Sequence, residues 1–327
     1  MDILLYTPTY YTSPGTQARI NLLKKSLEIA GHKPCLIMDS ESRLRAIYHT
    51  LGENLLVHKT IWKIMGKRIS KIILKRCRKT VLLFLDVTAS AIPYLRKKGI
   101  TTILSIENLT PEYKNYNPRS SNKFFQIFLE YADQADYIIS PSYTLSEHLR
   151  NMGLNVITVP IGLKPLIPFN EALSRSGPLT LLHAGQLDAL QKIKILLDLA
   201  SKYKIIVHNF GVLSKKLQHW NIKKYRTIIP ENATSIVKKA HIGVIIEYKK
   251  TYSLTRLYFH TALLQPIIGE GKGPWIKEAE HLNIKLHQLS YIEKIYQNYS
   301  HYVKEIVKIQ RKLSIPYIHS SLLNLLE

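Results

Sequence analysis

The sequence predicts an α/β protein made of two Rossmann-like domains in tandem. Short apolar runs, which have the length of buried strands, alternate with segments whose apolar residues recur at helical spacing. The alternation breaks at a proline-containing stretch and restarts near residue 178. Strands that alternate with helices pair in parallel, and their ligands bind beyond the carboxyl ends of the strands. We therefore expect the two domains to face a cleft that holds the functional site.

The first half contains the elements of one such domain. Strands are predicted over 2–6, 33–39, 80–87, 101–107, 136–142 and 155–162, and helices over 16–32, 59–80, 90–99 and 122–135. Gly31 is expected to end the first helix, because a glycine beyond the last turn readily takes the left-handed conformation. A further helix is expected to start at an N-cap formed by Ser142 or Thr144.

The second half repeats this organisation. Residues 163–178 contain three prolines and no hydrophobic period, which predicts a first domain over 1–163 and a linker over 164–177. The second domain is predicted over 178–300, and helices over 301–327 are expected to cross back to the first domain. The strands of the second domain are predicted over 179–183, 204–211, 225–230, 241–247 and 265–271, and its helices over 189–203, 232–239 and 253–264.

The composition favours anionic partners. The chain has 46 Lys and Arg against 23 Asp and Glu, which gives a formal net charge of +23. Nucleic acid, an acidic membrane surface and phosphorylated small molecules all fit that charge. Cys35 and Cys77 have no metal-ligand spacing, and no apolar run reaches the length of a signal peptide or a membrane span. These features predict a cytoplasmic protein without a metal site.

A strongly basic segment lies at 59–80, with nine Lys and Arg and no acidic residue. A basic amphipathic helix with a tryptophan at its edge suits an anionic membrane surface, which predicts peripheral binding at the inner face of the membrane. The expected contacts are Trp62, Lys63, Lys67, Arg68 and Lys71. The alternative is a helix that packs on the core and exposes a solvated basic face. Nucleic acid is not an expected partner, because no recognised nucleic-acid motif is present.

Three segments suggest chemistry. Gly185 follows a strand and precedes a helix that carries Lys192, and such a helix N-terminus suits a phosphate group. Glu247 ends another strand, and Ser253 is a predicted N-cap before Thr255 and Arg256, an arrangement suited to a diphosphate. Glu107, also at a strand end, has the chemistry to act on an acceptor hydroxyl. The alternatives are an ordinary turn, a normally capped helix with an exposed arginine, and a solvated loop acid.

Taken together, these segments resemble retaining glycosyltransferases of the GT-B fold, of the family-four type. "DILLYTPTYYTSPGTQARINLLKKSLEIAGHKP" resembles their first strand, acceptor loop and first helix. "ADQADYIISPSYTLSEHLRNMGLNVITVPIGL" is similar to the passage that closes their first domain. "LTLLHAGQLDALQKI" and "SIVKKAHIGVIIEYKKTYSLTRLYFHTALLQPII" look like their donor-binding segments. The order and spacing of these matches cover almost the whole chain.

The resemblance implies a hexosyltransferase that moves a sugar from a nucleotide sugar, most often a UDP-sugar, to a glycan or lipid-linked acceptor. It implies no metal and no other cofactor. Glu107 is then the catalytic candidate, and Gly15 and Thr16 border the acceptor. The implied donor-binding residues are Gly185, Gln186, Lys192, Ile228, Ile229, Glu247, Ser253, Leu254, Thr255 and Arg256, with Ile228 and Ile229 meeting the base through their backbone.

The sequence also departs from the family pattern. Gln186 stands where an arginine is often found, Phe259 where a glutamate usually binds the ribose, and Leu264 where a glycine is usual. Two alternatives therefore stay open. One is a nucleotide-sugar epimerase, which acts on its substrate without an acceptor. The other is a non-catalytic protein on the same fold that binds a nucleotide sugar or a polyanion.

Overall fold

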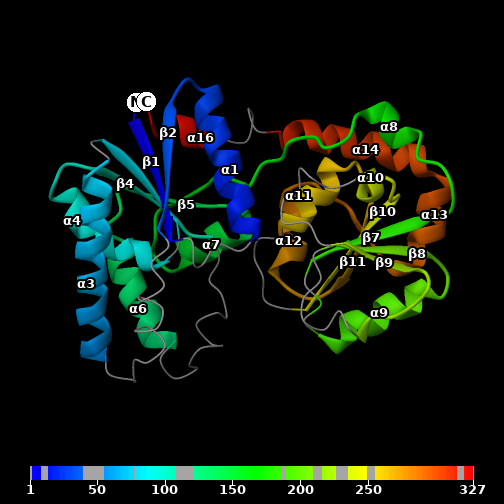
Figure 1. Cartoon of the computed structure of the whole chain (residues 1–327), viewed down its shortest axis with the longest axis horizontal. Coiled ribbons are helices and arrows are strands. Elements are labelled where there is room, and N and C mark those ends of the chain that lie inside the picture. Colours follow the sequence, from blue (N-terminus) through cyan, green and yellow to red (C-terminus); the bar gives the residue numbers. More distant parts are fainter. Residues whose placement is uncertain are drawn as a thin grey trace. The chain divides into compact units, whose positions relative to one another are not determined.

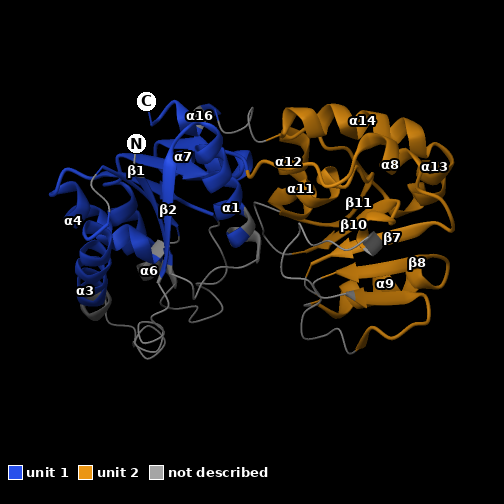
Figure 2. Cartoon of the chain, turned by 45° about the horizontal axis from the view of Figure 1, so that its top comes forward, with its two compact units in different colours: residues 1–160, 319–327 blue, residues 161–318 orange. Residues whose placement is uncertain are grey.

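The chain folds into two compact units, which are described separately (Figure 2). Unit 1 comprises residues 1–160 and 319–327, and unit 2 comprises residues 161–318. The computed structural model describes residues 2–8, 14–39, 55–76, 79–84, 86–107, 121–185, 187, 189–208, 216–225, 235–248, 255–314 and 320–326.

Unit 1 is built on a parallel sheet of six strands. They are β1 (Asp2–Pro8), β2 (Lys33–Asp39), β3 (Thr80–Phe84), β4 (Thr101–Ser105), β5 (Tyr137–Ser140) and β6 (Val156–Thr158). Their order is β2-β1-β3-β4-β5-β6, and every pair is parallel. The chain leaves β1 first toward β2 and later toward β3, so the strand order reverses between β1 and β3.

Helices cover both faces of this sheet (Figure 1). They are α1 (Pro14–Ile29), α3 (Leu55–Leu74), the 3-10 helix η2 (Asp86–Ala91), α4 (Ile92–Arg96), α6 (Ser121–Ala132), α7 (Tyr143–Asn151) and α16 (Ser320–Leu323). Buried residues of α1 pack with Leu322 and Leu326 from the C-terminal end of the chain. Ser142 is confirmed as the N-cap of α7, since its side chain accepts a hydrogen bond from the Leu145 amide.

Helix α3 packs closely against η2 through Gly66. A Cβ atom on Gly66 would lie 2.0 Å from the backbone oxygen of Ser90. Glycine normally weakens the interior of a helix by about 1 kcal/mol relative to alanine. Its presence here is therefore explained by the close approach of two backbones, and this contact fixes α3 as a core helix of unit 1.

Gly66→Ala is expected to lower the free energy of unfolding of unit 1 by about 2 kcal/mol, because overpacking against backbone outweighs the gain in helix propensity. Urea denaturation measures the change, followed by the fluorescence of Trp62, which lies four residues away on the same helix, in a Trp220→Phe and Trp275→Phe background. Lys67→Ala, an exposed substitution on α3, is the matched control and should change stability by less than about 0.5 kcal/mol. A Gly66→Ala variant as stable as the parent would contradict the close contact.

Unit 2 repeats the architecture with a second parallel sheet of six strands. They are β7 (Thr180–Ala184), β8 (Lys204–His208), β9 (Ile222–Tyr225), β10 (Ile242–Glu247), β11 (Ile267–Gly271) and β12 (Leu286–His287). Their order is β12-β11-β10-β7-β8-β9. The chain runs from β7 outward to β9 and then returns to β10 on the other side of β7. The strand order therefore reverses between β7 and β10.

The helices of unit 2 are α8 (Phe169–Leu173), α9 (Leu190–Ala200), α10 (Ser235–Lys238), α11 (Thr255–Ala262), α12 (Pro274–His281), η5 (Leu289–Tyr291), α13 (Ile292–Gln297) and α14 (Tyr299–Lys312). Residues 164–177, which were predicted to be a linker between the domains, form part of unit 2 instead. This segment forms α8, which packs through Ala172 against Tyr299 and Val303 of α14. The prolines here shape a packed connection rather than a free one.

Of the strand expected over 225–230, only Tyr225 is described, and it ends β9 (Ile222–Tyr225); residues 226–234 lie outside the described residues. The α/β class with two parallel sheets and alternating helices is confirmed. In the described part of the chain, every helix is too short or too polar to cross a membrane.

Candidate functional site

The candidate site lies in unit 2, where the strand order reverses. Gly185 follows β7, Glu247 ends the neighbouring strand β10, and the helices α9 and α11 begin shortly after these strands. In open parallel sheets this reversal leaves a crevice at the carboxyl ends of the strands, and ligands bind there. Sequence segments far apart in the chain are thereby brought to one place.

Two cations meet one carboxylate at this position. Lys192 Nζ lies 3.2 Å from Glu247 Oε2, and Arg256 Nη2 lies 2.5 Å from the same oxygen. The side chains of Lys192 and Glu247 are only 2% and 5% exposed. Two positive charges against one negative charge leave this trio with one net positive charge. Buried charge is costly unless it is compensated, so the Lys192–Glu247–Arg256 cluster is suited to an anionic ligand.

The carboxylate is held on a rigid backbone. The Glu247 carbonyl oxygen accepts hydrogen bonds from the Trp275 indole at 3.3 Å and from the Lys272 amide at 3.0 Å. Gly271 has a φ of +131°, and a Cβ atom there would lie 1.9 Å from this oxygen. The end of β11 therefore approaches Glu247 as closely as glycine allows, and this packing fixes the position of the cluster.

Gly185, which follows β7, lies directly against the side chain of Arg256. Its φ is +132°, and a Cβ atom would lie 2.9 Å from Cδ of Arg256 and 3.1 Å from Nη1. Both the backbone conformation and the space exclude a side chain here. The predicted role of Gly185, to let the backbone approach a ligand, is compatible with this geometry, and the structure adds that the glycine also accommodates Arg256.

Two buried histidines, His183 and His260, lie near Arg256 of the cluster. His183 Nδ1 lies 3.0 Å from the Val244 carbonyl oxygen and His260 Nδ1 lies 2.8 Å from Gln265 Oε1. Burial, assisted by the nearby Arg256, lowers the pKa of His183 to about 3, and burial lowers the pKa of His260 to about 4. Both rings are therefore neutral at pH 7, donate from Nδ1 and present Nε2 as an acceptor.

Several nitrogens of this site have spare hydrogen-bonding capacity. Arg256 Nη1, His183 Nε2 and His260 Nε2 are buried and form no hydrogen bond with the part of the chain that the structure describes. Buried polar atoms are usually paired, so groups of this kind call for an explanation. An anion beside Arg256 would supply the missing partner of its guanidinium.

Only one of the other predicted donor residues, Thr255, is described by the structure. Thr255 is the first residue of α11. Five lie outside the described residues: Gln186, Ile228, Ile229, Ser253 and Leu254. Phe259, where the sequence resemblance implies a ribose-binding glutamate, stacks on His208 with ring centroids 5.7 Å apart. Sequence reasoning missed His183 and His260, because thirteen histidines are scattered along the chain and only the fold shows which ones are buried.

In unit 1 the catalytic candidate Glu107 is part of an ion pair. Arg19 is fully buried, and its Nε lies 2.8 Å from Glu107 Oε1. The Ser105 hydroxyl donates to the same oxygen at 2.6 Å, and Arg19 Nη1 donates to the Val159 carbonyl at 2.9 Å. Glu107 is thus tied to α1 and to the segment after β6. Arg19 was not predicted, since its partners lie 86 to 140 residues away.

The acceptor candidates Gly15 and Thr16 both lie in the first turn of α1, whereas Gly15 was expected in the loop before the helix. Helix α1 starts at Pro14, and proline is favoured at the first position of a helix because it needs no amide hydrogen there. The expected helix start at residue 16 is therefore two residues late.

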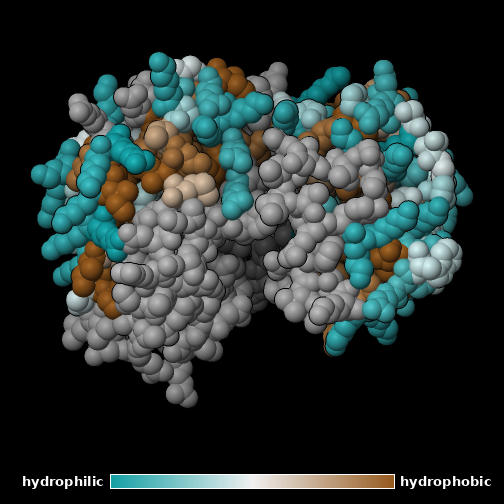
Figure 3. Space-filling model, in the orientation of Figure 1, coloured by the Kyte–Doolittle hydropathy of each residue, from teal (hydrophilic) through white to brown (hydrophobic). Residues whose placement is uncertain are grey.

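The membrane prediction needs one correction. Trp62 is fully buried and stacks on Tyr131 of α6 at 5.5 Å, so it is a core residue and no membrane contact. Lys63, Lys67 and Lys71 are exposed on α3, Arg68 is half-buried, and Ile64 is 59% exposed. Hydrophilic side chains dominate the left edge of Figure 3, where α3 and α4 lie. Membrane contact through these basic residues stays a prediction.

No protein-family model and no curated protein sequence matches the chain. Solved structures match it over its full length. HepE from Anabaena in complex with UDP and glucose has a TM-score of 0.69 at 12% identity, with 100% of this chain and 99% of that chain covered. Sucrose-phosphate synthase from Thermosynechococcus elongatus has a TM-score of 0.67 at 14% identity, with the same coverage.

A UDP-GlcNAc 2-epimerase from Methanocaldococcus jannaschii also matches, with a TM-score of 0.56 at 13% identity over 100% of this chain and 99% of that chain. At these identities the likeness shows the fold. The predicted class, two tandem Rossmann-like domains of the GT-B type, is confirmed, and so is the resemblance to GT-B proteins at the level of the fold.

Proposed function

We propose that the protein is a glycosyltransferase that takes its sugar from a nucleotide sugar and binds the donor diphosphate in unit 2. The observation that carries this proposal is the Lys192–Glu247–Arg256 cluster at the strand reversal beside Gly185. Cleavage of the sugar–phosphate bond leaves negative charge on the diphosphate. Fixed cations in a buried site stabilise that charge as it develops, which lowers the barrier to transfer.

The cluster suits this task because its cations are already in place. Glu247 holds Lys192 and Arg256 through one oxygen, and the backbone of Glu247 is itself anchored by β11 and Trp275. The neutral His183 and His260 leave the charge of the cluster unchanged, and their Nε2 atoms can accept only from a donor such as a sugar hydroxyl. We propose that these cations replace a metal ion, so that transfer needs no cofactor.

A UDP-sugar is the proposed donor, and a hexose the proposed transferred group. The support is the fold shared with HepE, whose structures contain UDP and glucose or UDP-glucose. We propose an acceptor that is a glycan or a lipid-linked glycan bound by unit 1, and transfer with retention, as the sequence resemblance implies. Glu107 is the candidate in unit 1, and its pairing with Arg19 favours a role in orienting an acceptor hydroxyl.

Titration calorimetry with UDP and uridine tests the donor site. Hydrogen bonds to charged groups contribute about 1.5–3 kcal/mol each, so two cations predict that UDP binds at least about a hundredfold more tightly than uridine. The affinity should be the same with and without EDTA. Equal binding of UDP and uridine would rule out the cluster as the holder of the diphosphate.

The second candidate is a nucleotide-sugar epimerase, favoured by the structural match to the 2-epimerase. Both candidate functions require UDP binding, so a binding experiment cannot distinguish them. The reaction that the protein catalyses on a UDP-sugar without an acceptor does distinguish them. NMR of UDP-GlcNAc incubated with the protein alone should show no 2-epimer if the protein is a transferase. Conversion without any acceptor would replace the transferase proposal with the epimerase.

A further inference from the structure

A groove lies in unit 2 at the amino ends of the strands, whereas the Lys192–Glu247–Arg256 cluster lies at their carboxyl ends. The volume of the groove is about 330 Å³, within the range of small-ligand sites. Residues at the amino ends of three strands line it, including Leu179 before β7, Lys204 at the start of β8 and Asn221 before β9. Strands rise about 3.3 Å per residue, so the five residues of β7 separate the groove from the cluster by about 15 Å.

The groove is bordered by an exposed tryptophan, Trp220, which is 84% exposed. Its ring is held from one side, because it stacks on His219 with centroids 5.8 Å apart at 24°. Asn221 fixes this turn, donating from its side chain to the Ala200 carbonyl at 2.8 Å and from its amide to His219 Nδ1 at 3.2 Å. A large aromatic surface is thus oriented by the fold and left open to solvent.

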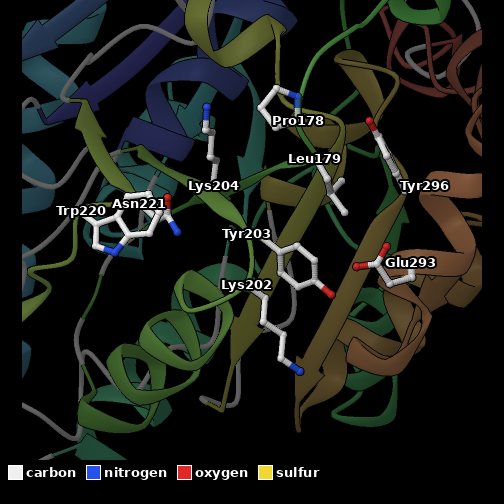
Figure 4. A pocket seen from close by; sticks show the side chains of 9 residues that line it. All are labelled: Pro178, Leu179, Lys202, Tyr203, Lys204, Trp220, Asn221, Glu293 and Tyr296. Atoms are coloured by element: carbon white, nitrogen blue, oxygen red, sulfur yellow. The ribbon is translucent and has the colours of Figure 1, made fainter.

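Cationic and anionic side chains both lie beside the aromatic rings of the groove. Figure 4 shows Trp220 on one side of the groove, Tyr296 and Glu293 on the other, and Tyr203 between them. Glu293 is exposed and accepts a hydrogen bond from the Tyr203 hydroxyl. Lys202 and Lys204 extend from either side of Tyr203. The groove therefore offers flat apolar rings, ammonium donors and a carboxylate acceptor.

We propose that this Trp220 groove is a second carbohydrate-binding site, which binds a saccharide chain independently of the donor nucleotide. A sugar ring has an apolar face of C–H groups that stacks on an aromatic ring, and an edge of hydroxyls that both donate and accept. The lysines donate to hydroxyls, and Glu293 accepts from them. A nucleic acid would meet Lys202 and Lys204 as well as Glu293, and the oligonucleotide arm of the test below distinguishes it from a saccharide.

The three tryptophans of the chain make this site measurable without a label. Trp62 and Trp275 are 0% and 1% exposed, whereas Trp220 is 84% exposed, so quenching of fluorescence by acrylamide reports on Trp220. We would screen the full-length protein on an array of neutral and acidic oligosaccharides and titrate the best binder in solution. The saccharide is expected to protect Trp220 from acrylamide.

Matched variants separate the two sites. Trp220→Ala should weaken saccharide binding at least about tenfold, a loss of about 1.4 kcal/mol, and leave the affinity for UDP unchanged. Trp220→Phe, which keeps a ring, should retain part of the binding. Lys216→Ala, an exposed substitution nearby in the sequence, should have no effect. Arg256→Ala should lose UDP and keep the saccharide, so failure of the donor proposal does not affect this test.

Three results would overturn the proposal. The first is the absence of binding to any oligosaccharide by a folded protein. The second is saccharide binding that Trp220→Ala leaves intact, which would place the saccharide elsewhere. The third is protection of Trp220 by a single-stranded oligonucleotide and by no saccharide, which would make the groove a nucleic-acid site.

Discussion

Arg256→Ala is expected to weaken UDP binding at least about tenfold while unit 2 stays folded. Arg256 supplies one of two cations in the cluster and a buried nitrogen, Nη1, that has no partner among the described residues. Its removal leaves Lys192 and Glu247 as a neutral pair, so the net positive charge that attracts the diphosphate is lost. The lost hydrogen bonds to charged oxygen atoms are worth about 1.5–3 kcal/mol each.

The fold should survive this change because Glu247 keeps a buried partner. Lys192 Nζ remains 3.2 Å from Glu247 Oε2, so no carboxylate is left buried and alone. The reverse change, Glu247→Ala, would instead leave two cations facing each other, and breaking a buried pair in this way costs about 3–5 kcal/mol. The contrast distinguishes a ligand-binding arginine from a residue that holds the fold.

Calorimetry with UDP measures the first effect, and circular dichroism confirms that each variant is folded. Lys194→Ala is the matched control, because Lys194 lies on α9 two residues from Lys192 and is exposed. Loss of an exposed charge is worth at most about 1 kcal/mol, so UDP affinity should fall by less than about fivefold. Wild-type UDP affinity in Arg256→Ala would refute the proposed placement of the diphosphate.

Much of the fold was predictable because the buried strands are short continuous apolar runs. β7 and β10 were placed to within one residue, and β3 to within three, since such runs are unambiguous between turns. The strand β9 was not predicted over its residues 222–224. Its residues, Ile222–Tyr225, include two lysines in sequence, and an edge strand needs little apolar surface. Helix α8 was missed because its stabilising contacts come from α14, about 130 residues later.

The candidate site was predictable only in its separate parts. Gly185, Lys192, Glu247 and Arg256 were each identified from local patterns at strand ends and helix starts. That Glu247 joins the two cations was not predictable, since Lys192 and Glu247 are 55 residues apart. The prediction that Trp62 contacts a membrane was wrong for a related reason. The helical position of Trp62 suggests an edge, but Tyr131 of a different helix covers it.

Mild acid is expected to destabilise unit 2 well before unit 1. All five buried histidines among the described residues, His183, His208, His241, His260 and His287, belong to unit 2. Burial lowers the pKa of His183 from 6.5 to about 3 and that of His260 from 6.5 to about 4. An unfolded chain restores the ordinary value, so between pH 6.5 and these lower values it binds more protons than the folded chain.

The sign of the effect follows from that difference. Stability is full above pH 6.5 and falls as the pH drops, because protons are taken up on unfolding. Each pH unit below 6.5 costs about 1.4 kcal/mol per histidine, so His183 and His260 each remove about 2 kcal/mol between pH 7 and pH 5. Together they remove a large part of the 5–15 kcal/mol that is typical of a folded protein.

Urea denaturation at pH 7, 6 and 5 measures the effect in each unit. Trp275, in a Trp62→Phe and Trp220→Phe background, reports on unit 2, and Trp62 in a Trp220→Phe and Trp275→Phe background reports on unit 1. The free energy of unfolding should fall steeply for unit 2 and little for unit 1.

His183→Asn keeps a donor for the Val244 carbonyl and cannot take up a proton, so it should lower stability at pH 7 yet flatten the fall toward pH 5. His148→Asn, an exposed change in unit 1, should leave both curves unchanged. If unit 2 were equally stable at pH 7 and pH 5, its buried histidines would have to be charged when folded, and the neutral site described here would be wrong.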